Sequence, residues 1–354
     1  MSARVLITGG AGFIGANLSL ELAARHSDWE ITALDNLHRR GSELNVPRLR
    51  DAGVRFVHGD VREPDDLRAA GGFDKLVECS AEPSVMAGVD GTTGFLVRTN
   101  LLGAYHCLEE AARHHAQVVF LSTSRVYPTR ALNELAFEER ETRFELLDEQ
   151  ALPGACALGV SEQFPLHGAR TLYGASKLAA ELLISEYAES FGLATVVNRC
   201  GVIAGPWQMG KVDQGVFTYW MLAHHFRRPL QYIGFGGQGK QVRDLLHVED
   251  LLELLDDQFQ DPERWDGATV NIGGGRDCSL SLLETTALCA EITGNTISVG
   301  SSVQTRPGDV PVYISDCRRL FELTRWCPHH GAQDVLADTH AWICAHEDAL
   351  RRSL

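Results

Sequence analysis

The sequence predicts an α/β fold in which a doubly wound parallel sheet is followed by a smaller C-terminal α/β lobe. Up to residue 200, short apolar runs alternate with segments of helical periodicity. This alternation is typical of a parallel sheet covered by helices. A glycine-rich turn at residues 9–15 joins the first apolar run to the first helical segment. That arrangement is expected for the first strand and helix of a Rossmann-type domain.

Two periodicities predict the elements of the first domain. Short runs rich in Val, Ile, Leu and Phe predict buried strands, and apolar residues three or four positions apart predict helices. We expect strands at residues 4–8, 30–34, 54–58, 75–79, 117–121 and 194–198, and helices at residues 13–25, 99–114 and 172–191.

The regular alternation ends after the sixth strand, where glycine-rich turns and shorter strands indicate a smaller lobe. We therefore predict a first domain over residues 1–200, with a loop insertion at 128–170. The second lobe covers residues 201–354, and part of it is expected to return to the first domain. The insertion is too long for a simple connection. A binding loop and an oligomer contact both remain open for it.

Composition argues against two classes of protein. The 354 residues are 44% hydrophobic and carry a formal net charge of −15, whereas a nucleic-acid-binding protein shows a basic surface. No apolar run is long enough to span a bilayer, and the first strand begins almost at the first residue, so we expect no signal peptide, no membrane association and a cytoplasmic location.

Cysteine and histidine spacing gives no sign of a metal site. The nine cysteines include no C-x-x-C pair, so we expect reduced thiols. The histidine pairs at 114–115, 224–225 and 329–330 lack a third ligand at a suitable spacing. We therefore expect no bound metal.

The glycine-rich turn predicts a dinucleotide site. Gly9, Gly12 and Gly15 follow a strand and open a helix, so the backbone can approach a pyrophosphate at the helix N-terminus. Asp35 ends the second strand, where a carboxylate accepts the ribose hydroxyls of NAD and repels a 2′-phosphate. The cofactor is therefore expected to be NAD, although Arg39 and Arg40 follow closely.

Other cofactor contacts are expected at the ends of the following strands. Asp60 and Val61 come after the third strand, where they can meet the adenine ring, although a simple strand-end turn is also possible. The remaining residues expected to contact the cofactor are Phe13, Ile14, Asn36, Ser80, Ala81 and Asn100, together with Tyr173 and Lys177.

Tyr173 and Lys177 predict alcohol–ketone redox chemistry. Residues four apart share a helix face, so the ammonium can lie beside the phenol. A tyrosine base near neutral pH needs its pKa lowered by about 3 units from about 10, or roughly 4 kcal/mol. A cation about 4 Å away in a partly shielded site supplies about that much. Thr123, at the end of the fifth strand, is placed to hydrogen-bond the same substrate hydroxyl.

The chain resembles the extended short-chain dehydrogenase/reductase superfamily, in the branch that modifies nucleotide-activated sugars. The resemblance covers the glycine loop, Asp35, Ser-Thr-x-x-Val-Tyr at 122–127 and Tyr-x-x-x-Lys at 173–177. It continues through 205–206, 241–244 and 306–309. It implies that Thr123, Tyr173 and Lys177 are catalytic, that NAD is the cofactor, and that the chain forms a homodimer or homotetramer.

Within that branch the chain is most similar to the CDP-paratose 2-epimerases, also called CDP-tyvelose 2-epimerases. The similar stretches are residues 133–135, 141–143, 205–215 and 239–244, and the most specific is Gln-x-Gly-x-x-Asp-Gln-Gly at 208–215. The 4,6-dehydratases that the chain also resembles carry Asp-Glu after the catalytic Thr, where this chain has Ser124 and Arg125. The 4-epimerases usually have Asn where this chain has Val202.

The resemblance therefore implies epimerisation at C2 of a CDP-hexose through a transient keto sugar, with the hydride returned internally. Arg243 and Arg306 are expected to clamp the diphosphate, although either also fits an ordinary salt bridge. The other expected substrate contacts are Ser124, Gln208, Lys211, Gln214, Gln241 and Asp309. The alternatives are a UDP-sugar 4-epimerase, another nucleotide-sugar oxidoreductase or decarboxylase, and a non-catalytic NAD-binding protein.

Overall fold

The computed structural model describes residues 2–88, 91, 93–210 and 214–353. The chain folds as two compact units. Unit 1 comprises Met1–Thr123, Leu172–Arg199 and Leu252–Thr269, and unit 2 comprises Ser124–Thr171, Cys200–Leu251 and Val270–Leu354. Each unit is therefore built from segments that are distant in the sequence.

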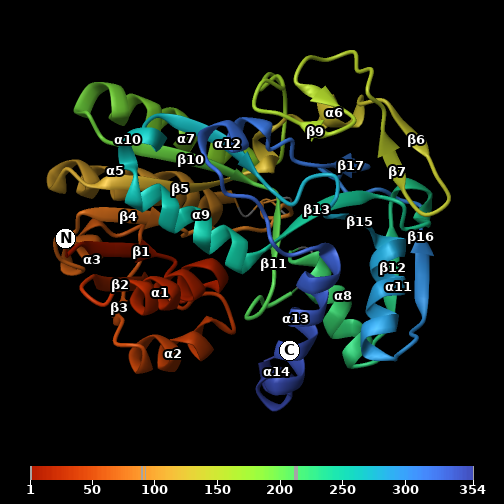
Figure 1. Ribbon diagram of the computed structural model, residues 1–354, viewed down its shortest axis with the longest axis horizontal. Helices are drawn as coiled ribbons and strands as arrows, with labels where there is room; N and C mark the ends of the chain where they lie inside the picture. The colour runs from red at the N-terminus through yellow and green to blue at the C-terminus, as the bar shows by residue number, and fades with distance from the viewer. Residues whose placement is uncertain (1, 89–90, 92, 211–213, 354) are drawn as a thin grey trace. The chain divides into compact units, whose positions relative to one another are not determined.

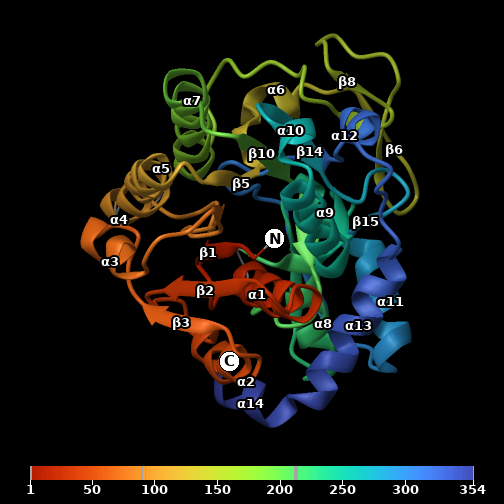
Figure 2. The same ribbon diagram turned by 60° about the vertical axis from the view of Figure 1, so that its left-hand side comes forward.

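A seven-stranded sheet holds unit 1 together. Its order is β14-β10-β5-β4-β1-β2-β3, and the pairings from β5 through β4, β1 and β2 to β3 are all parallel. The chain passes from β1 to β2 and β3 on one side and then crosses to β4 on the other (Figures 1 and 2). In an open parallel sheet, ligands bind at this reversal of strand order. The strands are β1 (Arg4–Thr8), β2 (Glu30–Asp35), β3 (Arg55–His58), β4 (Lys75–Glu78), β5 (Gln117–Thr123), β10 (Thr195–Cys200) and β14 (Ala268–Ile272).

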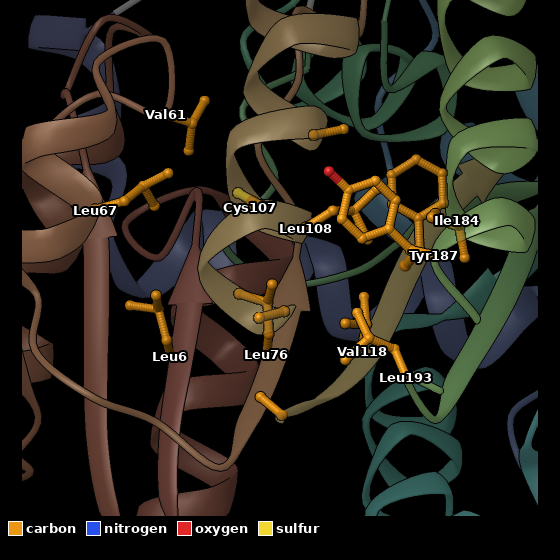
Figure 3. Packing of buried hydrophobic residues seen from close by; sticks show 14 of the residues in the cluster. Leu6, Val61, Leu67, Leu76, Cys107, Leu108, Val118, Ile184, Tyr187 and Leu193 are labelled. Carbon is orange, nitrogen blue, oxygen red and sulfur yellow. The ribbon is translucent and has the colours of Figure 1, made fainter. Parts of the chain in front are cut away.

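Helices of unit 1 cover the sheet and bury its apolar side chains. Leu6, Leu76 and Val118 from neighbouring strands pack against Leu108 of α5 and Ile184 of α7 (Figure 3). Each such buried aliphatic side chain contributes about 1.5–3 kcal/mol. The helical elements are α1 (Phe13–Arg25), η1 (Ser42–Leu44), α2 (Asn45–Asp51), α3 (Pro64–Ala69), α4 (Thr93–Val97), the π-helical turn η2 (Arg98–Leu102), α5 (Gly103–His114), α7 (Leu172–Phe191), α9 (Val248–Gln260) and α10 (Pro262–Trp265).

The prediction of a doubly wound parallel sheet is confirmed, and all six expected strands are present within one or two residues of their predicted ends. Two differences matter. A seventh strand, β14, returns to the edge of the sheet from residues 268–272. The helix expected at residues 99–114 begins as a π-helical turn, so α5 itself starts at Gly103.

Unit 2 contains smaller sheets. β13 pairs with β11 and β17 in parallel and with β15 antiparallel, and β12 pairs with β16. Its strands are β6 (Phe137–Glu139), β7 (Phe144–Leu146), β8 (Ala155–Cys156), β9 (Gly159–Val160), β11 (Val202–Ala204), β12 (Leu230–Ile233), β13 (Val242–His247), β15 (Ser279–Ser281), β16 (Val299–Ser302) and β17 (Val312–Tyr313). Its helices are η3 (Ser124–Val126), α6 (Thr129–Asn133), α8 (Val216–His225), η4 (Phe235–Gly237), α11 (Leu282–Thr293), α12 (Arg318–Leu323), α13 (Ala332–Ala345) and α14 (Glu347–Ser353).

The segment expected as a loop insertion of the first domain, residues 128–170, belongs instead to unit 2. It forms the short hairpins β6–β7 and β8–β9. The backbone N–H of Phe144 donates to Lys240 O at 2.9 Å, and the Thr142 hydroxyl donates to Glu284 at 2.6 Å. These contacts explain why the segment folds with unit 2. Among the described helices, none has the length and apolar character needed to cross a membrane.

Candidate active site

The glycine loop between β1 and α1 is tightly folded. Gly9 has a φ of +63°, which L-residues with a side chain rarely adopt, and a Cβ there would lie 2.9 Å from the Cys79 carbonyl carbon. A Cβ at Gly15 would collide with Gly9 O. Gly12 N donates to Gly9 O at 2.9 Å and closes the turn. The loop therefore requires glycine at these positions.

The start of α1 fits a pyrophosphate. Gly12 is the N-cap and contributes no side-chain cap, and the first turn, which begins with Phe13 and Ile14, contains no acidic residue. The N–H groups of a helix N-terminus and its dipole favour an anion. Since no side chain caps this end and no carboxylate from the first turn opposes the anion, the residues present fit a dinucleotide.

Asp35 lies at the carboxyl end of β2, next to this loop. Its carboxylate accepts hydrogen bonds from the backbone N–H of Ala11 at 3.0 Å and of Leu37 at 2.7 Å. Burial raises the pKa of Asp35, and these backbone donors oppose that rise. The carboxylate therefore ties the glycine loop to the end of β2, where a ribose hydroxyl donor is expected.

Asn36, Asp60 and Val61 form the turn region beside the ends of β2 and β3. Asn36 Nδ2 donates to Asp60 at 2.8 Å, and the Arg62 guanidinium forks onto the same carboxylate. Burial opposes its ionisation, but these donors lower the pKa of Asp60 to about 2. Val61 is 4% exposed and belongs to the core. Contact of Asp60 or Val61 with the cofactor stays a prediction.

Asn100 supports the loop that carries Ser80 and Ala81. It lies in the π-helical turn η2 and is buried. Its Oδ1 accepts from the Glu82 N–H at 2.8 Å, and its Nδ2 donates to Glu82 O at 3.1 Å and to Ser176 Oγ on α7 at 3.3 Å. π-helical turns are frequent at functional sites. Here the turn lets one side chain fasten the loop after β4 beside α7.

The three predicted catalytic residues all lie in unit 1. Thr123 is the last residue of β5, Tyr173 lies in the first turn of α7, and Lys177 follows one turn later. They are 7%, 9% and 2% exposed, respectively. α7 packs on β5. The hydroxyl, the phenol and the ammonium are therefore each shielded from water, where charges interact more strongly than in bulk solvent.

Glu78 is a charged partner that the sequence interpretation missed. It is the last residue of β4, and its Oε2 lies 3.2 Å from Lys177 Nζ, with both side chains 2% exposed. The ammonium also lies 4.3 Å from the centre of the Phe120 ring. Burial raises the pKa of Glu78, and Lys177 opposes that rise. A glutamate directly after Leu76 and Val77, at the ligand-binding end of the strand, was the signal available in the sequence.

A second buried ion pair holds the same face of α7. Arg199 on β10 pairs with Glu181 on α7 at 2.8 Å, and Ser122 on β5 donates to the same carboxylate. Glu181 lies one turn after Lys177. Separating Arg199 from Glu181 would leave an uncompensated buried charge, which is strongly unfavourable. The network therefore holds α7 against β5 and β10.

In unit 2, the half-buried Arg243 lies in a cluster with the half-buried Asp309. Its guanidinium donates to Asp309 Oδ1 and to Val310 O, each at 2.7 Å. Burial lowers the pKa of Arg243 to about 10, and the nearby Arg125 guanidinium lowers it further while Asp309 opposes both. Arg125 donates to Gly308 O at 3.1 Å. The Asp244 carboxylate also opposes the lowering of the Arg243 pKa, so two guanidiniums lie near two carboxylates.

The backbone N–H of Asp309 donates to Arg306 O at 3.2 Å, so the turn that begins with Arg306 belongs to the cluster of Arg243 and Asp309. Arg125 was not among the expected substrate residues, whereas its buried chain neighbour Ser124 was. The contact that brings Arg125 to this turn joins residues 183 positions apart, so spacing in the sequence could not reveal it.

The predicted glutamines have different surroundings in unit 2. Gln208 is buried, and its amide is engaged within the chain: Nε2 donates to Ile203 O at 2.7 Å and Oε1 accepts from Thr218 at 2.5 Å. Gln241 Nε2 donates to Ile233 O at 3.1 Å, while its buried Oε1 has no hydrogen-bond partner in the described part of the chain. Lys211 lies outside the described residues. Gln214, immediately after that gap, is half-buried.

Asp244, the last residue of the Gln-Val-Arg-Asp stretch, has a structural position. It is fully buried and accepts from the N–H of Ser315 at 3.1 Å and of Gly275 at 3.3 Å. Burial raises the pKa of Asp244 to about 6, although these donors oppose the rise. The carboxylate therefore fastens two loops of unit 2 to β13.

Residues 5–273 match the model of the NAD dependent epimerase/dehydratase family. The chain is 29% identical over 350 residues to a CDP-paratose 2-epimerase of Salmonella typhi, covering 96% of this chain and 98% of that protein. It is 30% identical over 351 residues to a dTDP-glucose 4,6-dehydratase of Streptomyces griseus, covering 98% and 95%.

Solved structures of the same size share the fold. The NAD complex of UDP-glucose 4-epimerase from Thermus thermophilus superposes with a TM-score of 0.76 at 27% identity, covering 96% of this chain and 99% of that chain. The UDP-glucuronic acid 4-epimerase of Bacillus cereus superposes with a TM-score of 0.78 at 20% identity, covering 97% and 99%.

Proposed function

We propose a function from the premise that this chain belongs to the NAD dependent epimerase/dehydratase family. NAD is its cofactor, and its relatives act on nucleotide sugars. We propose that the chain is a nucleotide-sugar epimerase that inverts C2 of a CDP-hexose. The single observation that carries this proposal is that α7, with Tyr173 and Lys177 in its first two turns, packs on β5, which ends at Thr123, in the unit that also contains a glycine loop fitting a dinucleotide.

The roles of these residues follow from their chemistry. Tyr173, as phenolate, removes the proton of the sugar hydroxyl, and Thr123 hydrogen-bonds the same oxygen. Lys177 stabilises the phenolate through its charge. When bound at the glycine loop, NAD would supply a reversible hydride acceptor for the sugar carbon. The keto sugar then turns, and Tyr173 gives its proton back to the new hydroxyl.

Two observations support C2 epimerisation over dehydration. The first is that the chain contains Gln-x-Gly-x-x-Asp-Gln-Gly at 208–215, and the second concerns the residues that follow Thr123. The dehydratases are as similar in overall identity, but no carboxylic acid follows Thr123 in the sequence. Ser124 is buried there, and Arg125 donates to the carbonyl of Gly308. A general acid for loss of the C6 hydroxyl is thus missing at those two positions.

The half-buried arginines of unit 2 support a nucleotide diphosphate as the anchor of the substrate. Arg243 lies beside both Arg125 and Asp309, and planar guanidiniums suit phosphate oxygens. We propose that Arg306 completes this clamp and that Gln214, Gln241 and Lys211 contact the sugar or the nucleotide. A homodimer or homotetramer and a cytoplasmic location remain predictions.

A product screen tests the proposal. The purified chain is incubated with CDP-, UDP- and GDP-hexoses, and the products are identified by NMR and mass spectrometry. We expect conversion of a CDP-hexose at C2 without change of mass. In deuterated water, internal hydride return should place no deuterium on C2.

The same screen separates the alternatives. Conversion of UDP-glucose to UDP-galactose would instead establish a 4-epimerase, as in the relative from Thermus thermophilus. Loss of water would establish a dehydratase. Absence of turnover across the panel with NAD bound would favour a non-catalytic NAD-binding protein.

A further inference from the structure

Three metal-ligating side chains meet between two helices of unit 2. His225 ends α8, and His340 and Cys344 lie one turn apart on α13, which packs against α8 (Figure 1). His225 Nδ1 lies 3.3 Å from His340 Nε2, and Cys344 Sγ lies 3.5 Å from His340 Nε2 and 4.0 Å from His225 Nδ1. Three potential ligand atoms therefore face one another within a single coordination shell.

These spacings match tetrahedral zinc coordination. Zn–N bonds of about 2.0–2.1 Å and a Zn–S bond of about 2.3 Å at tetrahedral angles place two nitrogens about 3.3 Å apart and nitrogen and sulfur about 3.5 Å apart. Two of the three observed distances have these values. The third, from His225 Nδ1 to Cys344 Sγ, is longer by about half an ångström, which a small rotation of the half-buried imidazole or the exposed thiol removes.

The protonation of His225 also suits a metal. Its other ring nitrogen, Nε2, lies 3.4 Å from Glu347 Oε2 at the start of α14. A carboxylate there holds the proton on Nε2 and leaves the Nδ1 lone pair directed at the cluster. Metal-bound histidines almost always have such a carboxylate or carbonyl partner on the second nitrogen.

A second histidine cluster in unit 2 lacks this feature. His247, Glu249 and His330 also lie close together, but His247 Nδ1 accepts the backbone N–H of Glu249 at 3.1 Å. The proton of a neutral ring must then be on Nε2, which lies 3.6 Å from Asp338 Oδ2. That nitrogen is a donor and not a ligand. Of the two clusters found in the described part of the chain, the one on α8 and α13 is therefore the one whose nitrogen lone pairs are directed at a common centre.

We propose that His225, His340 and Cys344 form a Zn²⁺ site that fastens α13 and α14 to α8. Binding displaces the thiol proton of Cys344 to solvent and leaves two neutral imidazoles, so the site carries one thiolate charge. Because Cys344 is exposed, water can take the fourth position. Imidazole and thiolate ligands in a tetrahedral arrangement favour zinc over magnesium or calcium. No sequence pattern indicated this site, because His225 and His340 are 115 positions apart.

Cobalt substitution tests the proposal without reference to enzymatic activity. The full chain, freed of metal by a chelator under reducing conditions, is titrated with Co²⁺ and then with Zn²⁺. We expect one equivalent of Co²⁺ to give the intense visible bands of tetrahedral coordination and a thiolate charge-transfer band, and one equivalent of Zn²⁺ to remove both. Zn²⁺ should also raise Tm, because it binds the folded state preferentially.

Matched variants locate the metal. Cys344→Ser should lose the charge-transfer band. Glu347→Gln removes the carboxylate beside His225 Nε2 and should weaken Zn²⁺ binding about 10–100-fold. His340→Gln removes a ligand and should weaken Zn²⁺ binding at least as strongly. Cys327→Ser removes another exposed free thiol and should bind like the wild type. Circular dichroism verifies that each variant folds. Zn²⁺ affinity that is equal in wild type, Cys344→Ser and His340→Gln, or no tetrahedral cobalt spectrum in the wild type, would overturn the proposal.

Discussion

The carboxylate of Glu78 and the ammonium of Lys177 lie 3.2 Å apart in a site that excludes water. Lys177 is proposed to favour the phenolate of Tyr173, so a negative charge beside the ammonium weakens that effect. The other titratable group facing Glu78 is the Cys107 thiol of α5, whose pKa is raised by burial and by Glu78 itself. The thiol therefore stays neutral and adds no second negative charge beside Glu78. Glu78 positions Lys177 and moderates its charge.

Replacing Glu78 by Gln should move the acid limb of the pH profile of kcat/KM to lower pH. Removing the carboxylate leaves the Lys177 charge uncompensated, and this stabilises a phenolate nearby by roughly 1 kcal/mol or more, or about one pH unit. Glu186→Gln removes the same formal charge from the exposed face of α7 and should leave the profile unchanged. An unchanged profile in Glu78→Gln would mean that the catalytic base does not sense this charge.

Tyr173→Phe should reduce kcat about 10²–10⁴-fold while NAD remains bound, because the variant lacks the proton acceptor but keeps the ring. Tyr187→Phe is the matched control, since Tyr187 lies on the same helix and donates to Glu109 instead. Both variants are assayed for turnover and for bound NAD. Normal turnover by Tyr173→Phe would exclude the proposed mechanism.

At the scale of elements, the turn between β1 and α1 depends on the absence of side chains. Gly15→Ala should reduce NAD affinity and lower the free energy of unfolding by about 1–3 kcal/mol, because its Cβ collides with Gly9 O and must displace the turn. Gly300→Ala is the control, because its Cβ would make only an ordinary 3.7 Å contact with Gln231. NAD content and chemical denaturation measure both effects. Retention of NAD and stability by Gly15→Ala would contradict this description of the turn.

Local patterns predicted the elements that are long and periodic. β1, β2, β4 and β5 each contain a short apolar run, and α7 has helical periodicity over twenty residues. The hairpins β6–β7 and β8–β9 were not predicted, because strands of two or three residues are too short to show an alternation of apolar and polar residues. The strand β14 was not predicted, because its place at the edge of the sheet depends on pairing with the distant strand β10. No local sequence pattern encodes that pairing.

The residues of the candidate site also fall into those that the sequence could predict and those that it could not. The residue types and spacing of Thr123, Tyr173 and Lys177 were sufficient to nominate them. Their partners were not predictable, because Glu78 and Lys177 are separated by 99 positions and Arg125 and Gly308 by 183. Gln208 illustrates the opposite case, since its motif suggested a ligand contact whereas its amide is hydrogen-bonded within unit 2.

At the scale of the whole molecule, the buried Asp244 makes stability depend on pH. Its pKa is about 6 in the folded chain and about 4 when unfolded, so the folded state binds the proton more tightly. This contribution to stability is present below about pH 4 and is lost as the pH rises through about 6. Two pKa units correspond to roughly 3 kcal/mol.

Asp244→Asn mimics the protonated form, so it should be more stable than wild type by roughly 1–3 kcal/mol at pH 8, and the difference should vanish near pH 4. Asp277→Asn removes the same charge at an exposed position and serves as control. Urea unfolding at several pH values measures the difference. A constant difference across this range would show that Asp244 does not titrate as its burial predicts.

The return of β14 to the sheet also has a consequence for biosynthesis. Residues 1–200 are synthesised before residues 268–272. The edge of β10 that pairs with β14 in the folded chain therefore stays unpaired until β14 has been made. Open edges of apolar strands pair readily with other chains. A fragment cut at residue 200, where the sequence suggests a domain boundary, would keep that edge permanently and should aggregate. The chain is expected to reach its soluble form only when nearly complete.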